Sequence, residues 1–231
     1  WSWGTNPYGQ LGDGTGTDRS TPGQIGTDND WVTMAAGRNH CLALKSNGTR
    51  WGWGINIFGH LGDGTSTSRN VPGQCGIDNN WVSVAAGGDH SLGLRSDGTL
   101  SAHGKNVDGQ LGDGTTVGKS SPVQVSILDG WLGIFGVFND ASFGIRANGT
   151  LWGWGGNYYG ELGNGNTINS ATPVQAGTDT KWVYVTGGGG HTLALKSDGT
   201  LWAWGRNDYG QLGDGTTTNR LIHTQIGSDN K

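Results

Sequence analysis

The chain has 231 residues, and its composition excludes several classes of protein. Its 14 Lys and Arg are outnumbered by 18 Asp and Glu, and the net charge of −4 argues against a nucleic-acid-binding protein, which usually has a clustered basic face. No apolar run approaches the ~20 residues that a membrane-spanning helix needs, so we expect no membrane insertion. The 47 Gly would suit a disordered chain, but 12 Trp are far too many for one.

One pattern is repeated five times along the chain. The copies start at residues 1, 51, 101, 152 and 202, and the last copy is incomplete. The fullest copy reads LWAWGRNDYGQLGDGT, from Leu201 to Thr216. Because self-similarity at a fixed period is the signature of a repeat architecture, we predict a single repeat domain over residues 1–231.

The strand signals follow one another in a fixed order within each copy. The chain opens on a strand that contains Trp1 and Trp3, and the next strand begins near Pro22. Over the following copy we expect strands at residues 32–36, 40–45 and 49–53, and a fourth from about Pro72. The Asn-Gly pair at residues 47–48 predicts a type I′ hairpin, because such pairs accept the positive φ that this turn needs. No segment shows a helical period.

Four antiparallel strands per repeat describe a blade of an all-β propeller. We expect four complete blades, at about 32–76, 82–126, 132–176 and 183–227, after a leading half-blade that has only the third and fourth strands. An open propeller exposes strand edges and apolar faces. We therefore expect a fragment of a larger propeller, or self-association of copies that completes it. A β-solenoid fits less well, because its rungs repeat every 20–30 residues or fewer.

The string GGGHTLALKSDGTLWAWGRNDYGQLGDGT, from Gly188 to Thr216, resembles the regulator of chromosome condensation repeat family in a bacterial-type, Trp- and Gly-rich form. The resemblance covers essentially the whole chain and implies a propeller, usually of seven blades. It implies less about function, because members of the family include a nucleotide exchange factor for a small GTPase, a plant UV-B photoreceptor and a secreted β-lactamase inhibitor.

Two of these activities are disfavoured by the sequence. The resemblance implies that exchange activity needs a wedge-like insertion between strands. Copies spaced by 50, 50, 51 and 50 residues leave no room for such an insertion here. The photoreceptor's Gly-Trp-Arg-His-Thr motif is replaced here by stretches such as Gly37-Arg-Asn-His40. No catalytic motif and no cofactor motif emerges. We therefore predict a non-enzymatic binding or scaffold module that presents its loops to a protein or a glycan, with an exchange-factor-like regulator of a small GTPase as the alternative.

Several polar residues recur at one position of the repeat. His40, His90 and His191 lie one blade apart, too far to share a metal ion at ~2.1 Å, so we interpret them as structural groups bonded to the backbone of the next blade. Aspartates precede each blade and recur in the Gly-Asp-Gly loops, where one carboxylate per loop is too few for calcium, so we interpret them as turn formers. These aspartates are Asp13, Asp63, Asp113 and Asp214 in the loops, and Asp28, Asp78, Asp129, Asp179 and Asp229 before the blades.

The third copy departs from its siblings at three aromatic positions, which read Ser101, His103 and Asp108. The neighbouring loop between the first two strands of the next blade is one residue longer than its counterparts. Two interpretations stay open. Phe135, Phe138 and Phe143 could refill the volume that the missing Trp left, because core voids are costly. Alternatively, the region is a partner-binding site, whose residues would be His103, Lys105, Asp108, Phe138 and Asp140.

Basic residues recur just before the fourth strand, and they offer a basic rim for an acidic partner. The alternative is a set of solvated loop charges. The residues of this rim are Arg19, Arg69, Lys119 and Arg220. The two cysteines, Cys41 and Cys75, fall at unrelated positions of the repeat, so we expect both to be buried free thiols.

Overall fold

The computed structural model describes residues 1–126, 128–138 and 140–227, in which eighteen strands and no helix occur. The strands are β1 (Ser2–Gly4), β2 (Arg19–Gly23), β3 (Trp31–Ala36), β4 (His40–Lys45), β5 (Arg50–Gly54), β6 (Arg69–Gln74), β7 (Trp81–Ala86), β8 (His90–Arg95), β9 (Leu100–Gly104), β10 (Lys119–Gln124), β11 (Trp131–Gly136), β12 (Ala141–Arg146), β13 (Leu151–Gly155), β14 (Ser170–Gln175), β15 (Trp182–Gly187), β16 (His191–Lys196), β17 (Leu201–Gly205) and β18 (Arg220–Ile226).

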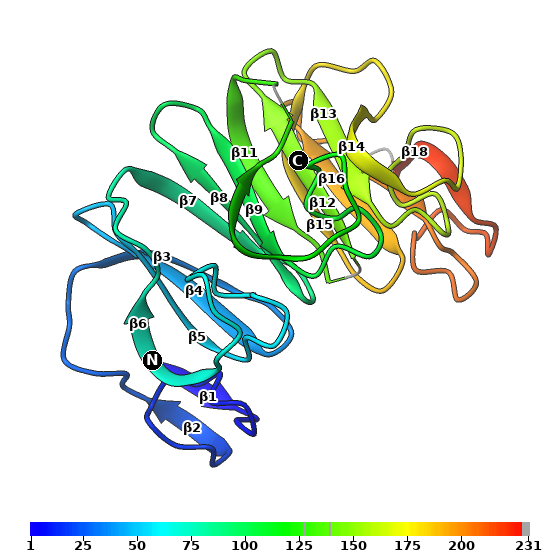
Figure 1. The fold of residues 1–231 in the computed structure, drawn as a ribbon. Coiled ribbons are helices and arrows are strands. Elements are labelled where there is room, and N and C mark those ends of the chain that lie inside the picture. The colour runs from blue at the N-terminus through cyan, green and yellow to red at the C-terminus, as the bar shows by residue number, and fades with distance from the viewer. Residues whose placement is uncertain (127, 139, 228–231) are drawn as a thin grey trace.

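The strands form four antiparallel sheets of four strands, β3–β6, β7–β10, β11–β14 and β15–β18, and one two-stranded sheet, β1–β2. Each four-stranded sheet is one blade, numbered one to four here, and β1–β2 is the half-blade. The blades follow one another in chain order, and the half-blade and the red end of the last blade lie at opposite ends of the row (Figure 1). The predicted all-β propeller with four complete blades and a leading half-blade is confirmed. The strands are three to seven residues long.

The hairpin turn between the second and third strands is not of type I′. Gly48 has a φ of 78°, but Ser126 is the one non-Gly residue with a positive φ in the described part of the chain, so Asn47 does not share that conformation. The Gly48 N–H donates to the Lys45 carbonyl at 2.9 Å, and the Lys45 N–H donates to the Thr49 carbonyl at 3.1 Å. This is a type I turn followed by a left-handed glycine, the usual three-residue hairpin connection.

The apolar core lies between successive blades. In the first such cluster, Leu42 and Leu44 of β4 pack with Trp81 and Val84 of β7. The second and third interfaces repeat this arrangement, with Ile134 of β11 and then Val185 of β15 in the place of Val84. The rule is that the second strand of one blade covers the fourth residue of the first strand in the next blade.

In the third copy, an arginine forms a hydrogen bond with each of the two residues that replace a Trp. Arg50 of β5 lies in the place of Leu100 and Leu151, is 1% exposed, and has its guanidinium 4.8 Å from the Trp81 ring centroid. Its Nη1 bonds to Nε2 of His103, and its Nη2 donates to the Gly62 carbonyl.

At Ser101, which replaces the other Trp, Arg95 donates a hydrogen bond to the serine hydroxyl at 3.1 Å. The predicted refilling by phenylalanine is therefore wrong. Phe143 packs edge-on against Trp204 between the third and fourth blades, and Phe135 packs against Tyr184. The cause is that β9, the first strand of the third copy, belongs to the second blade, whereas the three Phe belong to the third blade.

The described residues contain no helix that is long and apolar enough to cross a membrane.

Candidate functional site

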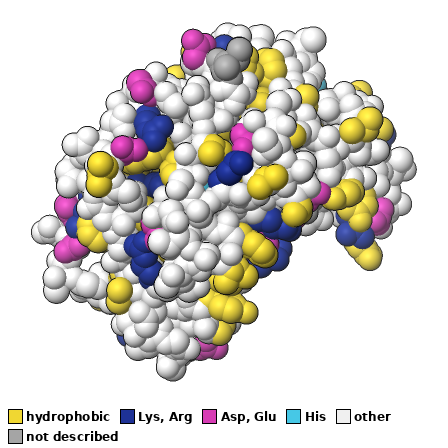
Figure 2. All heavy atoms as spheres, viewed as in Figure 1, with side chains coloured by type: hydrophobic (Ala, Val, Ile, Leu, Met, Phe, Trp, Pro, Cys, Tyr) yellow, Lys and Arg dark blue, Asp and Glu magenta, His cyan; other side chains and the backbone are white. Residues whose placement is uncertain are grey.

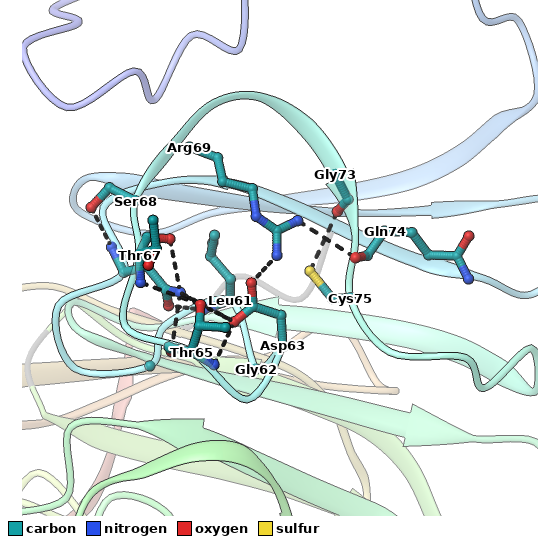
Figure 3. A network of polar contacts seen from close by, with 12 residues as sticks. Leu61, Gly62, Asp63, Thr65, Thr67, Ser68, Arg69, Gly73, Gln74 and Cys75 are labelled. Atoms are coloured by element: carbon teal, nitrogen blue, oxygen red, sulfur yellow. Dashed lines mark hydrogen bonds and ion pairs between the residues drawn. The ribbon is translucent and has the colours of Figure 1, made fainter.

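The long loop between the third and fourth strands of each blade is built around a buried asparagine. In the first blade, Asn56 Nδ2 donates to Asp63 Oδ1 and to the carbonyls of Thr65 and Thr67, and its Oδ1 accepts from the Leu61 N–H. Figure 3 shows the loop residues of this network, with the Arg69 side chain directed toward Asp63. The same bonds recur in every copy around Asn6, Asn106, Asn157 and Asn207. These loops are thus preformed platforms on one end of the propeller.

The loop aspartates are turn formers, as predicted. Asp13 Oδ1 accepts from both the N–H and the hydroxyl of Thr15, at 3.0 and 2.7 Å, and these bonds lower the pKa of the Asp13 carboxyl. In the described part of the chain, no group of three or more His, Cys, Asp or Glu is arranged to hold a metal ion.

Each residue of the predicted basic rim is paired with the aspartate of its own loop. Arg19 lies 3.4 Å from Asp13, and Arg220 lies 2.6 Å from Asp214. Arg69 pairs with Asp63, and Lys119 approaches Asp113 at 3.9 Å. Figure 2 shows cations in separate spots on the face in view, several of them beside acidic side chains. Because each rim charge is paired locally, the binding of an acidic partner there stays a prediction.

Two of the three repeated histidines, His40 and His90, connect neighbouring blades. His40 Nε2 lies 2.9 Å from Ser91 Oγ, and His90 Nε2 lies 2.7 Å from Ser142 Oγ. The Ser91 hydroxyl in turn donates to the His60 carbonyl at 2.7 Å. Since the hydroxyl proton is used there, the imidazole is the donor in the first bond. For His40 and His90 the structural interpretation holds, but the partner is a side-chain hydroxyl of the next blade rather than its backbone. For His191 it stays a prediction.

Burial keeps these imidazoles neutral. It lowers the pKa of His40 to about 3 and that of His90 to about 4, because a charged ring would be desolvated in the core. His60 lies 5.1 Å from the His40 ring, and burial lowers its pKa as well, although Asp89 opposes the shift. The propeller therefore contains a group of neutral histidines beneath the loop face.

Four of the five predicted partner-site residues lie in loops on the same end of the propeller. Phe138 is 51% exposed, and Lys105 Nζ lies 3.0 Å from Asp140 Oδ2. Asp140 also accepts from Gln110 at 3.0 Å. Asp108 lies apart from this pair and accepts from the Tyr158 hydroxyl and from Asn169 Nδ2. That contact raises the pKa of Tyr158.

His103 is not at this surface. Its side chain is fully buried between the first two blades, where it bonds to Arg50 and to the Gly59 carbonyl. Burial and the neighbouring Arg50 cation hold its pKa well below the usual range. Its place in the structure is that of an interior packing residue.

Two surface residues escaped the sequence analysis, Arg38 and Asp89. The Arg38 guanidinium lies 5.0 Å from the Phe138 ring centroid and 3.7 Å from Asp89, and it reaches from the first blade across the second to the third. A Cβ at Gly88 would lie 2.6 Å from the Phe138 carbonyl oxygen, so a glycine is needed beneath the Phe138 loop. We call the five residues Arg38, Asp89, Lys105, Phe138 and Asp140 the Phe138 patch.

The sequence profile of the RCC1-like domain matches residues 1–230. The chain belongs to the RCC1-like domain family. Among solved structures, human WBSCR16 superposes with a TM-score of 0.84 at 25% identity, over 97% of this chain and 61% of that protein. Yeast RCC1 (Prp20) bound to Kap60 gives a TM-score of 0.83 at 21% identity, over 94% of this chain and 54% of that one.

Prp20p of Saccharomyces cerevisiae, in a structure described with its binding to Gsp1p and histones, gives 0.80 at 22% identity, over 91% of this chain and 54% of that one. No curated protein sequence matches this RCC1-like chain. The chain thus spans between about half and three fifths of the length of these RCC1-like structures. The sequence-based family resemblance is confirmed.

Proposed function

We propose that this RCC1-like propeller is a non-enzymatic binding module that holds a protein partner on the Phe138 patch. The observation that carries the proposal is the half-exposed Phe138 ring beneath the Arg38 guanidinium. Aromatic residues and Arg are enriched among the residues that dominate protein–protein binding energy. The surrounding pairs, Arg38 with Asp89 and Lys105 with Asp140, supply a polar rim of both signs.

The RCC1-like neighbours support a protein partner in general terms. One is described in complex with Kap60, and one is described with binding to Gsp1p and histones. A glycan partner, and self-association of the chain, stay predictions. Regulation of a small GTPase by nucleotide exchange is the alternative, and a stimulation of nucleotide release by the purified chain would favour it.

The test compares two substitutions at equally exposed apolar residues. Phe138→Ala should weaken partner binding by ~10-fold or more, because loss of a central aromatic contact typically costs above ~1 kcal/mol. Ile222→Ala on β18, where the side chain is 60% exposed, is the matched control and should leave affinity unchanged. Both variants should keep the melting temperature nearly unchanged. A large loss of melting temperature in Phe138→Ala with binding intact would show that Phe138 serves the core, and the proposal would be abandoned.

A further inference from the structure

A hollow of about 420 Å³ lies between the long loops of the first and second blades. Ile57 and Phe58 of the first loop and Val107 of the second line it, and these apolar side chains are 48–63% exposed. Lys105 is the only charged residue among the described residues of its lining. We call it the Gly118 hollow, after the glycine of the second loop that lines it. It is thus an apolar site with one cation at its wall.

The Gly118 hollow lies where one side chain of the repeat is missing. In four of the five copies, the residue at this place accepts a hydrogen bond from the backbone N–H of the buried loop asparagine, at 2.7–3.0 Å. The acceptors are Asp18 for Asn6, Ser68 for Asn56, Asn169 for Asn157 and Asn219 for Asn207. In the second blade the place is taken by Gly118, and the Asn106 N–H has no acceptor among the described residues. Asn106 is 1% exposed, so this buried donor needs a partner from outside the chain, which is water or a ligand.

The junction between the second and third blades shows how the same space is closed elsewhere. There the Asp108 carboxylate of the preceding loop accepts from Asn169 Nδ2 at 2.9 Å and from the Tyr158 hydroxyl at 2.5 Å. No such bridge can form between the first and second blades, where the corresponding residues are Phe58, Gly118 and Val107. The Gly118 hollow therefore lacks both an acceptor for the loop N–H and a polar bridge across the junction.

We infer that the Gly118 hollow binds an acidic side chain of a protein partner. The carboxylate accepts from the Asn106 N–H, as the Asp18 carboxylate accepts from the corresponding N–H of the first copy at 2.7 Å. Lys105 Nζ lies 3.0 Å from Asp140 Oδ2 and has further N–H donors for a second carboxylate. Since no acidic residue is among the described residues of the lining, charge favours an anion over an amide or a hydroxyl. The exposed apolar side chains contact the stem of the bound residue and its neighbours.

The probe is the blocked dipeptide acetyl-Asp-Phe-amide, which joins a protein-like carboxylate to an apolar group. It is titrated into the full chain labelled with ¹⁵N, and the backbone amide signals of Asn106 and Val107 are followed by NMR. Both signals should shift to saturation. The isosteric acetyl-Asn-Phe-amide should bind at least ~3-fold more weakly, because a charge-assisted hydrogen bond is roughly twice as strong as a neutral one. Free 3-phenylpropionate, titrated in parallel, tests whether a small carboxylate is bound instead of a peptide.

Protein variants locate the site. Gly118→Asn returns the repeat's own acceptor to the Asn106 N–H, so it should weaken binding of the dipeptide at least ~10-fold. It should also raise the melting temperature by ~2–4 °C, because a buried donor gains a partner. Gly118→Ala is the matched control: it adds the same Cβ, 3.0 Å from the Gly104 carbonyl oxygen, but no acceptor, and should keep most of the binding.

Two further variants separate this site from the Phe138 patch, with which it shares only Lys105. Lys105→Gln should weaken binding of the dipeptide ~2- to 5-fold, the range expected for one partly exposed ion pair. Phe138→Ala should leave binding of the dipeptide unchanged, because the inference rests on the Asn106 N–H and not on the Phe138 ring. Gly118→Asn can therefore fail while the Phe138 test succeeds, and the reverse.

Four results would overturn the inference. The first is the absence of a saturable shift at Asn106 with acetyl-Asp-Phe-amide. The second is equal binding of the Asp and Asn dipeptides, because the site would then not select a carboxylate. The third is equal weakening by Gly118→Asn and Gly118→Ala, since filled space and not the returned acceptor would then be the cause. The fourth is saturable binding of 3-phenylpropionate with none of the dipeptide, which would make a free small carboxylate the ligand.

Discussion

Restoring the repeat's apolar pattern between β5 and β9 should stabilise the protein. Arg50 replaces a Leu and His103 replaces a Trp, and the two side chains meet in the core. The double variant Arg50→Leu/His103→Trp would rebuild the arrangement of Leu151 and Trp204, which belong to one buried apolar cluster. The double variant tests whether Arg50 and His103 compensate for each other, so that each residue is tolerated only in the presence of the other.

The size of the effect follows from the state of Arg50. Burial lowers the pKa of this guanidinium to about 10, a shift that corresponds to ~3 kcal/mol against its charged form. Its Nε has no hydrogen-bond partner, whereas Nη1 and Nη2 bond to His103 and Gly62. Replacing such a buried polar pair by packed apolar side chains is often neutral or stabilising by ~1–4 kcal/mol, and we expect a gain of ~2 kcal/mol.

The single variants should behave differently from the pair. His103→Trp alone should cost ~3–5 kcal/mol, because it removes an acceptor from a buried cation. Arg50→Leu alone should cost ~1–2 kcal/mol, because it leaves a buried imidazole nitrogen without a partner. Urea unfolding of the four proteins at pH 7.5 gives the coupling free energy. A double variant less stable than the unchanged protein, or single effects that add to the double effect, would refute the reasoning.

Three further predictions concern the repeated features. The folded-state pKa values of about 3 for His40 and about 4 for His90 lie below the ordinary 6.5, so the stability that their neutral forms contribute is present above pH 6.5 and is lost as the pH falls toward 4. The free energy of unfolding should drop by ~2–3 kcal/mol per histidine between pH 7.5 and 4.5, and His90→Gln should reduce that drop; equal drops in both proteins would contradict the assignment. Asn106→Ala should cost ~3 kcal/mol or more, since it leaves the Thr115 and Val117 carbonyls and the Leu111 N–H without partners, and amide exchange at Leu111 would report it; slow exchange in the variant would count against the role of Asn106. Gly88→Ala should displace Phe138 and weaken partner binding with little loss of melting temperature, whereas Gly189→Ala, where a Cβ meets nothing within 4 Å, should change neither; equal effects would contradict the packing argument.

The blades were predictable because the same pattern of apolar, Gly and turn residues occurs in several copies along the chain. The His, Leu-x-Leu and Trp-x-Trp spacings recur in most copies, so the fold of a copy that departs from one of them can still be predicted from the others. Cys41 was expected to be buried, but it is only partly buried. Its side chain lines a hollow beside the half-blade. Cys75 is buried, as predicted.

Contacts between blades were harder to predict than the blades themselves. Arg38 and Phe138 are 100 positions apart and meet because Gly88 leaves space in the loop between them. Arg50 and His103 are two departures from the repeat in facing strands, and a comparison of departures between neighbouring copies could have paired them. The three Phe were assigned to the wrong void because a sequence copy and a structural blade begin at different strands.

The central claim, that a protein partner is held on the Phe138 patch, is tested most directly by site-specific photo-crosslinking. A photoreactive residue is placed at Phe138 in one protein and at Ile222, which is 60% exposed on β18, in another. Each is irradiated with the purified partner, and the crosslinked product is mapped by mass spectrometry. The account predicts a single crosslinked partner surface from position 138 and none from position 222. Crosslinking from position 222 with none from position 138 would contradict it.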